Sequence, residues 1–277
     1  MAEGSNLSAE YLDELEAKSI FIIREAYHQF KDKLALLWSI GKDSTTMLYL
    51  ARKAFFGKVP FPVVHIDTSY KFEEIYEFRD KYAKEWNLKL IIARNEEALK
   101  EGMSPEKGKF ACCTALKTEA LKQAIKKYGF KALLVAIRRD EHGIRAKERY
   151  FSIRDSNFQW NYKDQPPEFW DQYNLIKLDE EGAHLRIHPM LHWREQDVWL
   201  YIKKENIPVV SLYFAKNGKR YRSIGCKTCC FAIPSNAKTI DEIIEELQTT
   251  KISERAGRAQ DKESLYMMQR LRALGYM

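Results

Sequence analysis

The chain has 277 residues, of which 45% are hydrophobic and 13% aromatic. This composition supplies a sizeable core and excludes collagen-like, mucin-like and intrinsically disordered proteins. With 46 basic and 39 acidic residues the formal net charge is +7, which favours an anionic partner such as a nucleotide, a nucleic acid or a small oxyanion. The length predicts one large domain, alone or with a small appendage.

The sequence gives no sign of export or of membrane insertion. The first 16 residues carry five acidic side chains and no apolar core, unlike a signal or transit peptide. The longest apolar run, Leu34–Trp38, is far shorter than the roughly 18 residues that span a membrane. We therefore expect a cytoplasmic protein with no membrane partner.

Hydrophobic spacing predicts helices that alternate with short strands along the first half of the chain. An amphipathic helix is expected over residues 10–30, followed by a strand at 34–38 and a helix at 45–54. The alternation continues with strands at 62–66, 88–92 and 132–137 and with helices at 73–86 and 114–128. This order is typical of an α/β fold with a doubly wound, mainly parallel sheet, similar to a Rossmann fold.

The second half is less regular. Residues 138–182 are polar and aromatic and predict a long functional loop with some helix. Helices are expected at 195–205, 240–248 and 262–274, the second of them announced by a capping box of Thr239 and Glu242. We expect residues 1–210 to form the α/β domain and residues 211–277 a C-terminal extension.

Residues 39–45, Ser-Ile-Gly-Lys-Asp-Ser-Thr, occupy the turn between the first strand and the next helix. Glycine permits close backbone approach, small hydroxyls donate hydrogen bonds, and the amides of a helix N-terminus attract phosphate oxygens. The segment is not a Walker loop, because Leu36 stands where the first glycine is required and Asp43 follows the Gly-Lys pair. The alternative is a capped turn that binds nothing.

The motif Ser-x-Gly-x-Asp-Ser-Thr resembles the pyrophosphate loop of the adenine nucleotide alpha hydrolase superfamily. Three later segments follow in the order of one branch of it, at residues 65–72, 138–149 and 188–199. From about Leu12 to Gly275 the chain is similar to the small, ATP-cleaving subunit of bacterial ATP sulfurylase and, more distantly, to the sulfonucleotide reductases. The likeness includes Ser-Glu-Arg-Ala-Gly-Arg at 253–258.

The resemblance implies that ATP is cleaved between its α and β phosphates and that AMP passes to an acceptor. It implies ATP contacts from Ser39, Ile40, Gly41, Asp43, Ser44, Thr45, Asp67 and Thr68. Because pyrophosphate leaves, catalysis needs Mg²⁺ and cationic groups over the developing charge. The candidate catalytic residues are Lys42, Asp43, Arg138, Arg139 and Arg145. The alternative for the arginines is a solvated helix face paired with nearby acids.

Five cysteines form two clusters, Cys112-Cys113 and Cys226, Cys229 and Cys230. Four thiolates from Cys112, Cys113, Cys226 and Cys229 suit a [4Fe-4S] cluster or a structural Zn²⁺. This pattern resembles the cluster-bearing sulfonucleotide reductases and departs from the ATP sulfurylase subunit. A cysteine-bearing tail like that of the reductases is missing from the end of the chain. Cys230 is interpreted as a small buried hydrophobic residue, and the alternative is that it supplies the attacking thiol of a reductase.

Several acceptors for the adenylyl group are open. Sulfate, or another oxyanion, comes first, and for it the resemblance implies a GTPase large subunit as partner. The second hypothesis is iron-sulfur-dependent thiolation of nucleic acid, in DNA phosphorothioation or tRNA thiolation, with a cysteine desulfurase as partner. Reduction of a sulfonucleotide is third, and a non-enzymatic nucleotide-binding module fourth. Five cations between 216 and 227, interleaved with aromatic residues, fit either nucleic acid or sulfate.

Overall fold

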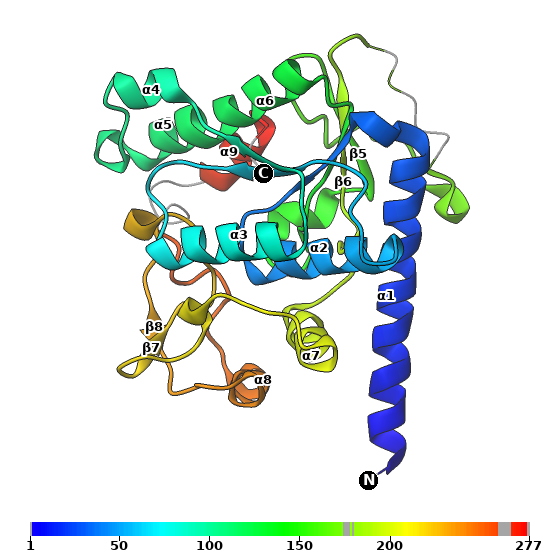
Figure 1. Cartoon of the computed structure of the whole chain (residues 1–277), viewed down its shortest axis with the longest axis vertical. Coiled ribbons are helices and arrows are strands. Elements are labelled where there is room, and N and C mark those ends of the chain that lie inside the picture. The colour runs from blue at the N-terminus through cyan, green and yellow to red at the C-terminus, as the bar shows by residue number, and fades with distance from the viewer. Residues whose placement is uncertain (1, 174–177, 179, 260–266, 276–277) are drawn as a thin grey trace.

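The computed structural model describes residues 2–173, 178, 180–259 and 267–275, with residues 2–8 as backbone only. A six-stranded sheet with the order β3-β2-β1-β4-β6-β5 forms its centre (Figure 1). The strands are β1 (Leu34–Leu37), β2 (Val63–Ile66), β3 (Leu90–Ala93), β4 (Ala132–Leu134), β5 (Phe151–Arg154) and β6 (His184–Ile187). All neighbouring pairs are parallel except β5 with β6. The predicted mainly parallel α/β fold is confirmed.

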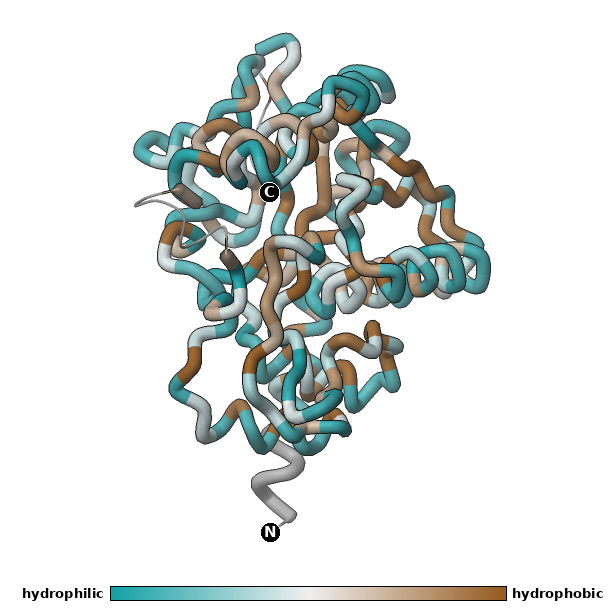
Figure 2. Tube along the Cα trace, turned by 90° about the vertical axis from the view of Figure 1, so that its left-hand side faces the viewer, coloured by the Kyte–Doolittle hydropathy of each residue, from teal (hydrophilic) through white to brown (hydrophobic). Residues whose placement is uncertain are grey.

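Continuous apolar runs place β1, β2 and β4 at the centre of the sheet. Every residue of these three strands is buried, as expected for strands covered on both faces. Leu36 of β1 pairs with Val63 of β2 and with Leu134 of β4. In Figure 2 the apolar stretches lie mainly inside the trace and the hydrophilic ones mainly around its outside. The core therefore fills the space between this sheet and the helices.

Helices cover the sheet and supply most of the outer surface. They are α1 (Ala2–Phe30), α2 (Lys42–Ala54), α3 (Glu73–Glu85), α4 (Glu96–Lys100), α5 (Lys109–Cys113), α6 (Ala120–Tyr128), α7 (Glu195–Glu205), α8 (Ile240–Thr249) and α9 (Met267–Ala273). A π-helical stretch at Thr114–Glu119 joins α5 to α6, and Gly129, with φ of 65°, ends α6. None of the described helices has the length and apolar character needed to cross a membrane.

The region expected to be a long loop, at residues 138–182, contains one strand and is followed by another, and neither was predicted from the sequence. Strand β5 lies within it, and β6 follows directly. Short 3₁₀ turns at Gly143–Lys147 and Phe169–Asp171 account for the helix expected there. Both strands were hidden because short strands with polar and charged residues have no clear hydrophobic period.

The segment after residue 210 packs against the α/β body. It contains a two-stranded sheet of β7 (Lys219–Arg220) and β8 (Ile233–Pro234), followed by α8. The predicted capping box is confirmed, because the Glu242 amide donates to Thr239 Oγ1 at 3.2 Å and the Thr239 amide donates to Glu242 at 3.0 Å. Of the helix expected at 262–274, residues 262–266 lie outside the described residues and α9 accounts for most of the rest.

Candidate active site

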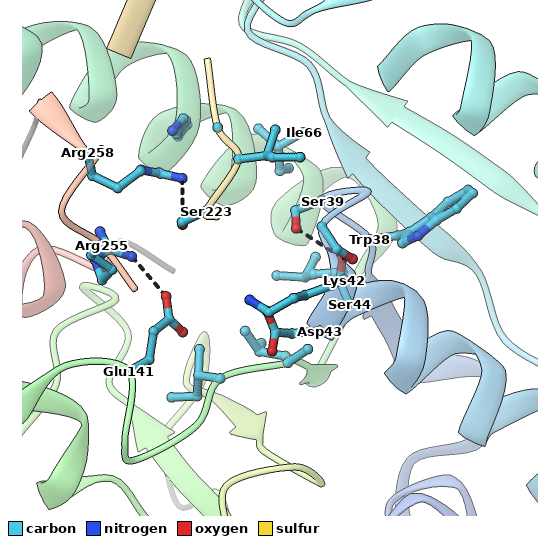
Figure 3. Close-up of a pocket in the computed structure, with 18 of the residues that line it drawn as sticks. Trp38, Ser39, Lys42, Asp43, Ser44, Ile66, Glu141, Ser223, Arg255 and Arg258 are labelled. Carbon is cyan, nitrogen blue, oxygen red and sulfur yellow. Dashed lines mark hydrogen bonds and ion pairs between the residues drawn. The ribbon is translucent and has the colours of Figure 1, made fainter. Parts of the chain in front are cut away.

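A pocket opens beyond the carboxyl ends of the central parallel strands, where α/β sheets usually bind ligands. Its floor comes from the ends of β1 and β2 and from residues 135–137 after β4. One side is the loop that starts at Ser39, and the other comes from the C-terminal segments around residues 223–225 and 255–258. Figure 3 shows Lys42 and Asp43 facing Arg255 and Arg258 across this space.

The loop at Ser39 leads directly into α2, so the first amides of that helix point toward the pocket. The Ser39 and Ser44 hydroxyls lie 3.0 Å apart, and Ser44 Oγ also donates to the Gly41 carbonyl at 3.1 Å. Ile40, with φ of 69°, is the left-handed residue of the turn, whereas Gly41 has φ of −73°. The backbone of the turn therefore does not require glycine at position 41, where a Cβ would lie 3.5 Å from the Ser39 and Tyr213 hydroxyls.

A closed network of four charged side chains lies behind the loop. The Lys42 ammonium contacts the Glu254 carboxylate and lies 3.2 Å from Asp43 Oδ2. The Arg138 guanidinium contacts Asp43 and Glu254, and its Nε lies 3.0 Å from Asp140. Lys42 is 1% exposed and Arg138 is fully buried. Burial would raise the pKa of Glu254, but Arg138 and Lys42 hold it well below its usual range.

The opposite side of the pocket is strongly cationic. Arg255 Nη1 lies 2.9 Å from Glu141, which Arg145 also contacts, and Arg258 donates to Ser223 Oγ at 3.3 Å. Altogether six cations and two carboxylates line the described pocket, namely Lys42, Lys71, Lys117, Arg145, Arg255 and Arg258 with Asp43 and Glu141. Such an excess of positive charge in a concave site attracts phosphate and sulfate groups.

The structure brings most of the predicted loop residues to the pocket but not all of them. Those that line it are Ser39, Gly41, Lys42, Asp43 and Ser44, together with Arg145. Ile40 is 1% exposed and packs in the hydrophobic core. Thr45 Oγ1 accepts a hydrogen bond from Trp38 Nε1 at 3.1 Å, so its side chain holds the loop to β1.

Four further predicted residues lie outside the pocket lining, and one of them, Arg138, is fully buried in the ion network behind the loop. The Asp67 carboxylate accepts hydrogen bonds from the Ser69 amide at 2.8 Å and from the Tyr76 hydroxyl at 2.9 Å, and it pairs with Arg94. Thr68 Oγ1 lies 3.2 Å from Cys226 Sγ.

Arg139, the last of these residues, does not line the pocket. Its Nη2 donates to the Glu148 carbonyl at 3.3 Å, and its guanidinium stacks on the Tyr150 ring. Neither Arg138 nor Arg139 therefore lines the pocket.

All five cysteines are buried and none forms a disulfide. Burial, together with the nearby thiols of Cys113, Cys226 and Cys229, raises the pKa of Cys112 to about 12. Cys113 and Cys226 are 113 positions apart in the sequence, yet the two predicted cysteine pairs are close enough in space to influence one another's pKa. Among the described residues, however, no three His, Cys, Asp or Glu side chains are arranged to hold a metal ion. Cys230 packs in the hydrophobic core, as expected.

The cationic stretch between 216 and 227 is less available than its sequence suggests. Arg222 donates to both oxygens of Glu195, and Arg220 Nη2 lies 2.7 Å from Glu246. Both arginines are buried, with exposures of 8% and 1%. Two of the five cations are therefore buried against carboxylates, so this segment is not a continuous phosphate-binding surface.

The sequence analysis missed several residues of the site. One of them is Tyr213, whose hydroxyl accepts a hydrogen bond from the Lys42 amide at 2.8 Å and so holds the loop in place. Glu254 closes the ion network, and Lys117 and Lys71 line the far side. The charged run at 253–258 was a visible signal, whereas no local pattern marks Tyr213 or Lys117.

Comparison with known proteins places the chain in a family. The phosphoadenosine phosphosulfate reductase domain matches residues 33–232. "Sulfate adenylyltransferase subunit 2" of Azotobacter vinelandii is 42% identical over 96% of this chain and 98% of its own length. The protein of the same name from Shigella dysenteriae is 41% identical over 96% of this chain and 97% of its own.

Solved structures agree on the fold. Phosphoadenylyl-sulfate reductase from Candida auris has a TM-score of 0.54 at 19% identity and covers 81% of this chain and 97% of its own. FMN adenylyltransferase from Candida glabrata, in complex with FAD and inorganic pyrophosphate, has a TM-score of 0.59 at 16% identity and covers 91% of this chain and 96% of its own. The chain therefore belongs to the phosphoadenosine phosphosulfate reductase domain family and, within it, groups with sulfate adenylyltransferase subunit 2.

Proposed function

We propose that this chain is an ATP-dependent adenylyltransferase that transfers AMP to sulfate, giving adenylylsulfate and pyrophosphate. The observation that carries the proposal is the pocket at the carboxyl ends of the strands, which has two sides that attract anions. One side is the N-terminus of α2 with Lys42, and the other carries cations that include Lys117, Arg255 and Arg258. Two oxyanions, the triphosphate of ATP and the acceptor, need two such sides. The relatives named sulfate adenylyltransferase subunit 2, at 42% identity over 96% of the chain, support sulfate as the acceptor.

The chemistry follows from the geometry of the two sides. The N-terminus of α2 and Lys42 bind the β and γ phosphates, with the Ser39 and Ser44 hydroxyls as donors. A sulfate oxygen held near Lys71, Lys117 and Arg258 attacks the α phosphorus. The new phosphorus–oxygen bond forms as the bond to the bridging oxygen breaks, and pyrophosphate leaves with the electron pair. No covalent enzyme intermediate is needed, because positioning brings the acceptor into line.

The cations act mainly on the leaving group. Negative charge grows on pyrophosphate as the bond breaks, and buried Lys42 stabilises it without the reorganisation that water would require. Glu254 and Asp43 fix the Lys42 ammonium in place before ATP arrives. Bound Mg²⁺ would supply further positive charge on the phosphates, and Asp43, the carboxylate of the loop that lines the pocket, would help to hold it.

A second subunit is part of this proposal. The names of the relatives mark them as one subunit of a larger enzyme. Formation of a mixed phosphate–sulfate anhydride is strongly uphill, and a GTPase large subunit would supply the driving force. We therefore propose a GTPase large subunit as the partner of this chain.

A metal-bound group on Cys112, Cys113, Cys226 and Cys229 is a separate proposal. The four thiols share one neighbourhood, which supports it, but their arrangement does not form a ready metal site. We assign no catalytic step to a [4Fe-4S] cluster or to Zn²⁺. Thiolation of nucleic acid is not favoured, because the relatives are named for sulfate and because Arg220 and Arg222 are buried in ion pairs.

The test is pyrophosphate release from ATP by the purified chain with its GTPase large subunit. We expect release to rise with sulfate and GTP and to stay at the basal rate with DNA or tRNA. A matched Asp43→Ala, Ser44→Ala double variant should lose the sulfate-dependent part. Release that ignores sulfate but rises with nucleic acid would overturn the choice of acceptor. Release that survives the double variant would overturn the assignment of the loop.

A further inference from the structure

Tyr213 is the only tyrosine among the described residues that line the pocket. It belongs to the 3₁₀ turn Ser211–Tyr213, which follows α7, and it is 1% exposed. Its ring packs edge-on against the buried ring of Trp199 in α7, with centroids 5.4 Å apart and planes 84° apart. The core therefore fixes the position of the ring, and the hydroxyl at its end reaches the loop that begins at Ser39.

The Tyr213 hydroxyl makes one hydrogen bond in the structure and can make another. Its oxygen accepts a hydrogen bond at 2.8 Å from the amide of Lys42, the first residue of α2. A phenol also carries a proton that it can donate. Among the described residues no acceptor receives that proton. The hydroxyl therefore occupies one amide of the helix N-terminus and offers its own proton in place of that amide.

The hydroxyl keeps this proton at neutral pH, because its surroundings raise the pKa of Tyr213 above the ordinary value for tyrosine. Burial is the main cause, and the Glu254 carboxylate raises the pKa further. Lys42 and Arg258 act in the opposite direction without cancelling the rise. Glu254 and Arg258 belong to the C-terminal segment, and Lys42 belongs to α2. The neutral phenol is therefore a hydrogen-bond donor in a site that binds anions.

Three hydroxyls lie close to Gly41 in this part of the pocket. A side chain at position 41 would begin 3.5 Å from Ser39 Oγ and 3.5 Å from the Tyr213 hydroxyl. Ser44 Oγ lies 3.0 Å from Ser39 Oγ, and Figure 3 shows both serines beside Lys42. All of these residues line the pocket. Because glycine has no side chain, an oxyanion can approach the backbone at the point where these donors converge.

We infer that Tyr213 is a catalytic residue, whose hydroxyl donates a hydrogen bond to an oxygen of the departing pyrophosphate. The inference rests on the proposed function, in which pyrophosphate leaves from the N-terminal end of α2. Additional negative charge appears on the pyrophosphate as its bond to the α phosphorus breaks, so this hydrogen bond strengthens in the transition state. A hydrogen bond from a hydroxyl to an ionised oxygen is short and strong. The hydrogen bond from the Lys42 amide polarises the hydroxyl and makes it a better donor.

The first experiment measures sulfate-dependent pyrophosphate release by Tyr213→Phe and by the wild type, each with the GTPase large subunit. We expect kcat to fall about 10²-fold and KM for ATP to change less than about threefold, because the lost hydrogen bond acts mainly in the transition state. Tyr173→Phe is the matched control. Tyr173 is also 1% exposed, its hydroxyl donates to Asp171 at 2.7 Å, and it does not line the pocket. The control should change kcat less than about twofold, and circular dichroism checks that both variants are folded.

A second variant separates proton donation from simply holding the loop in place. Tyr213→3,5-difluorotyrosine keeps the ring and the hydroxyl, while the fluorine atoms lower the pKa of the phenol. Once ionised, the oxygen still accepts the hydrogen bond from the Lys42 amide but has no proton to donate. We therefore expect kcat of this variant to fall with rising pH, at pH values where the wild type keeps its phenol proton and its full rate.

The outcomes separate this inference from the proposed function. A Tyr213→Phe variant with the kcat of the wild type would overturn the inference. A difluorotyrosine variant whose pH profile matches that of the wild type would overturn it as well, because the hydroxyl would then only hold the loop. Release by the wild type that responds to nucleic acid and ignores sulfate would overturn the proposed acceptor. In that case a fall in kcat of Tyr213→Phe would still support the inference, because pyrophosphate leaves in both reactions.

Discussion

The Ser39 loop and the cysteine neighbourhood are two sites of this molecule that were both expected from sequence motifs, and they differ in how completely the fold assembles them. At the loop, the Lys42 ammonium, Asp43, Arg138 and Glu254 form a closed network of contacts. At the cysteines, the thiols come near enough to influence one another's pKa, but no three ligands are arranged for a metal.

The difference follows from the charges. Opposite charges in the loop network stabilise each other inside the protein, so the site is preorganised without ligand. Burial raises the pKa of Cys112, and the neighbouring thiols, which disfavour each other's ionised forms, raise it further. Around Cys226 burial would raise the thiol pKa, but Lys117 and Lys71 lower it to about 7. The two sites predict different responses to substitution.

The largest effect should come from Lys42. Lys42→Ala removes the buried cation next to the leaving pyrophosphate, and we expect a loss of about 10³-fold in kcat for pyrophosphate release. Steady-state kinetics with saturating ATP measure it. Thermal unfolding of the same variant reports the structural cost separately. A loss of less than about tenfold would contradict the placement of Lys42 on the leaving group.

Glu254→Gln should be the most destabilising change in the network. Arg138 would keep only part of its charge partners in a buried site, so we expect a loss of about 3 kcal/mol in the free energy of unfolding at neutral pH. Glu245→Gln, on an exposed position of α8, is the matched control. Urea unfolding measures both variants.

The wild type and the Glu254→Gln variant should also differ in how their stability depends on pH. The folded-state pKa of Glu254 lies below the usual value of 4.5, so its carboxylate stabilises the fold above pH 4.5. This contribution is lost as the pH falls below 4.5 through the lower, folded-state pKa. The free energy of unfolding of the wild type should therefore exceed that of the Gln variant most at neutral pH, and the difference should shrink in acid. A constant difference across this range would contradict the assigned charge state.

Two arginines of one predicted motif, Arg139 and Arg145, test which of the candidate cations acts on ATP. Arg145 lines the pocket, whereas Arg139 stacks on Tyr150 outside it. We expect Arg145→Ala to lower kcat/KM for ATP by about 10²-fold and Arg139→Ala by only a few fold. Equal losses would show that Arg139 reaches the substrate after all, as the sequence first indicated.

The cysteine neighbourhood should have the smallest effect on ATP cleavage. If the four-thiolate prediction is correct, anaerobically purified protein is brown and contains iron, and Cys112→Ser bleaches it, with pyrophosphate release reduced less than in Lys42→Ala. Elemental analysis distinguishes iron from zinc. A colourless protein free of both metals would contradict the prediction and leave the buried thiols as packing residues. Cys230→Ser serves as the control, because Cys230 lies in the core.

The alternation of short apolar runs with amphipathic segments was enough to predict the parallel α/β sheet and the position of the Ser39 loop. These features can be predicted locally, because a short stretch of adjacent residues is enough to specify a buried strand or a helix N-terminus. The capping box of Thr239 and Glu242 was predictable for the same reason. The approach of Cys112-Cys113 to Cys226 and Cys229 could be expected only from the pattern of a family.

Tertiary structure alone decided which charged residues meet. Nothing near Lys42 in the sequence indicates that Glu254, 212 positions later, pairs with its ammonium group. Nor does any local pattern indicate that the Tyr213 hydroxyl accepts a hydrogen bond from the Lys42 amide. The strands β5 and β6 were hidden for a related reason. Their conformations depend on contacts with segments that are distant in the sequence. A local sequence pattern reflects only the interactions between residues that are close together along the chain.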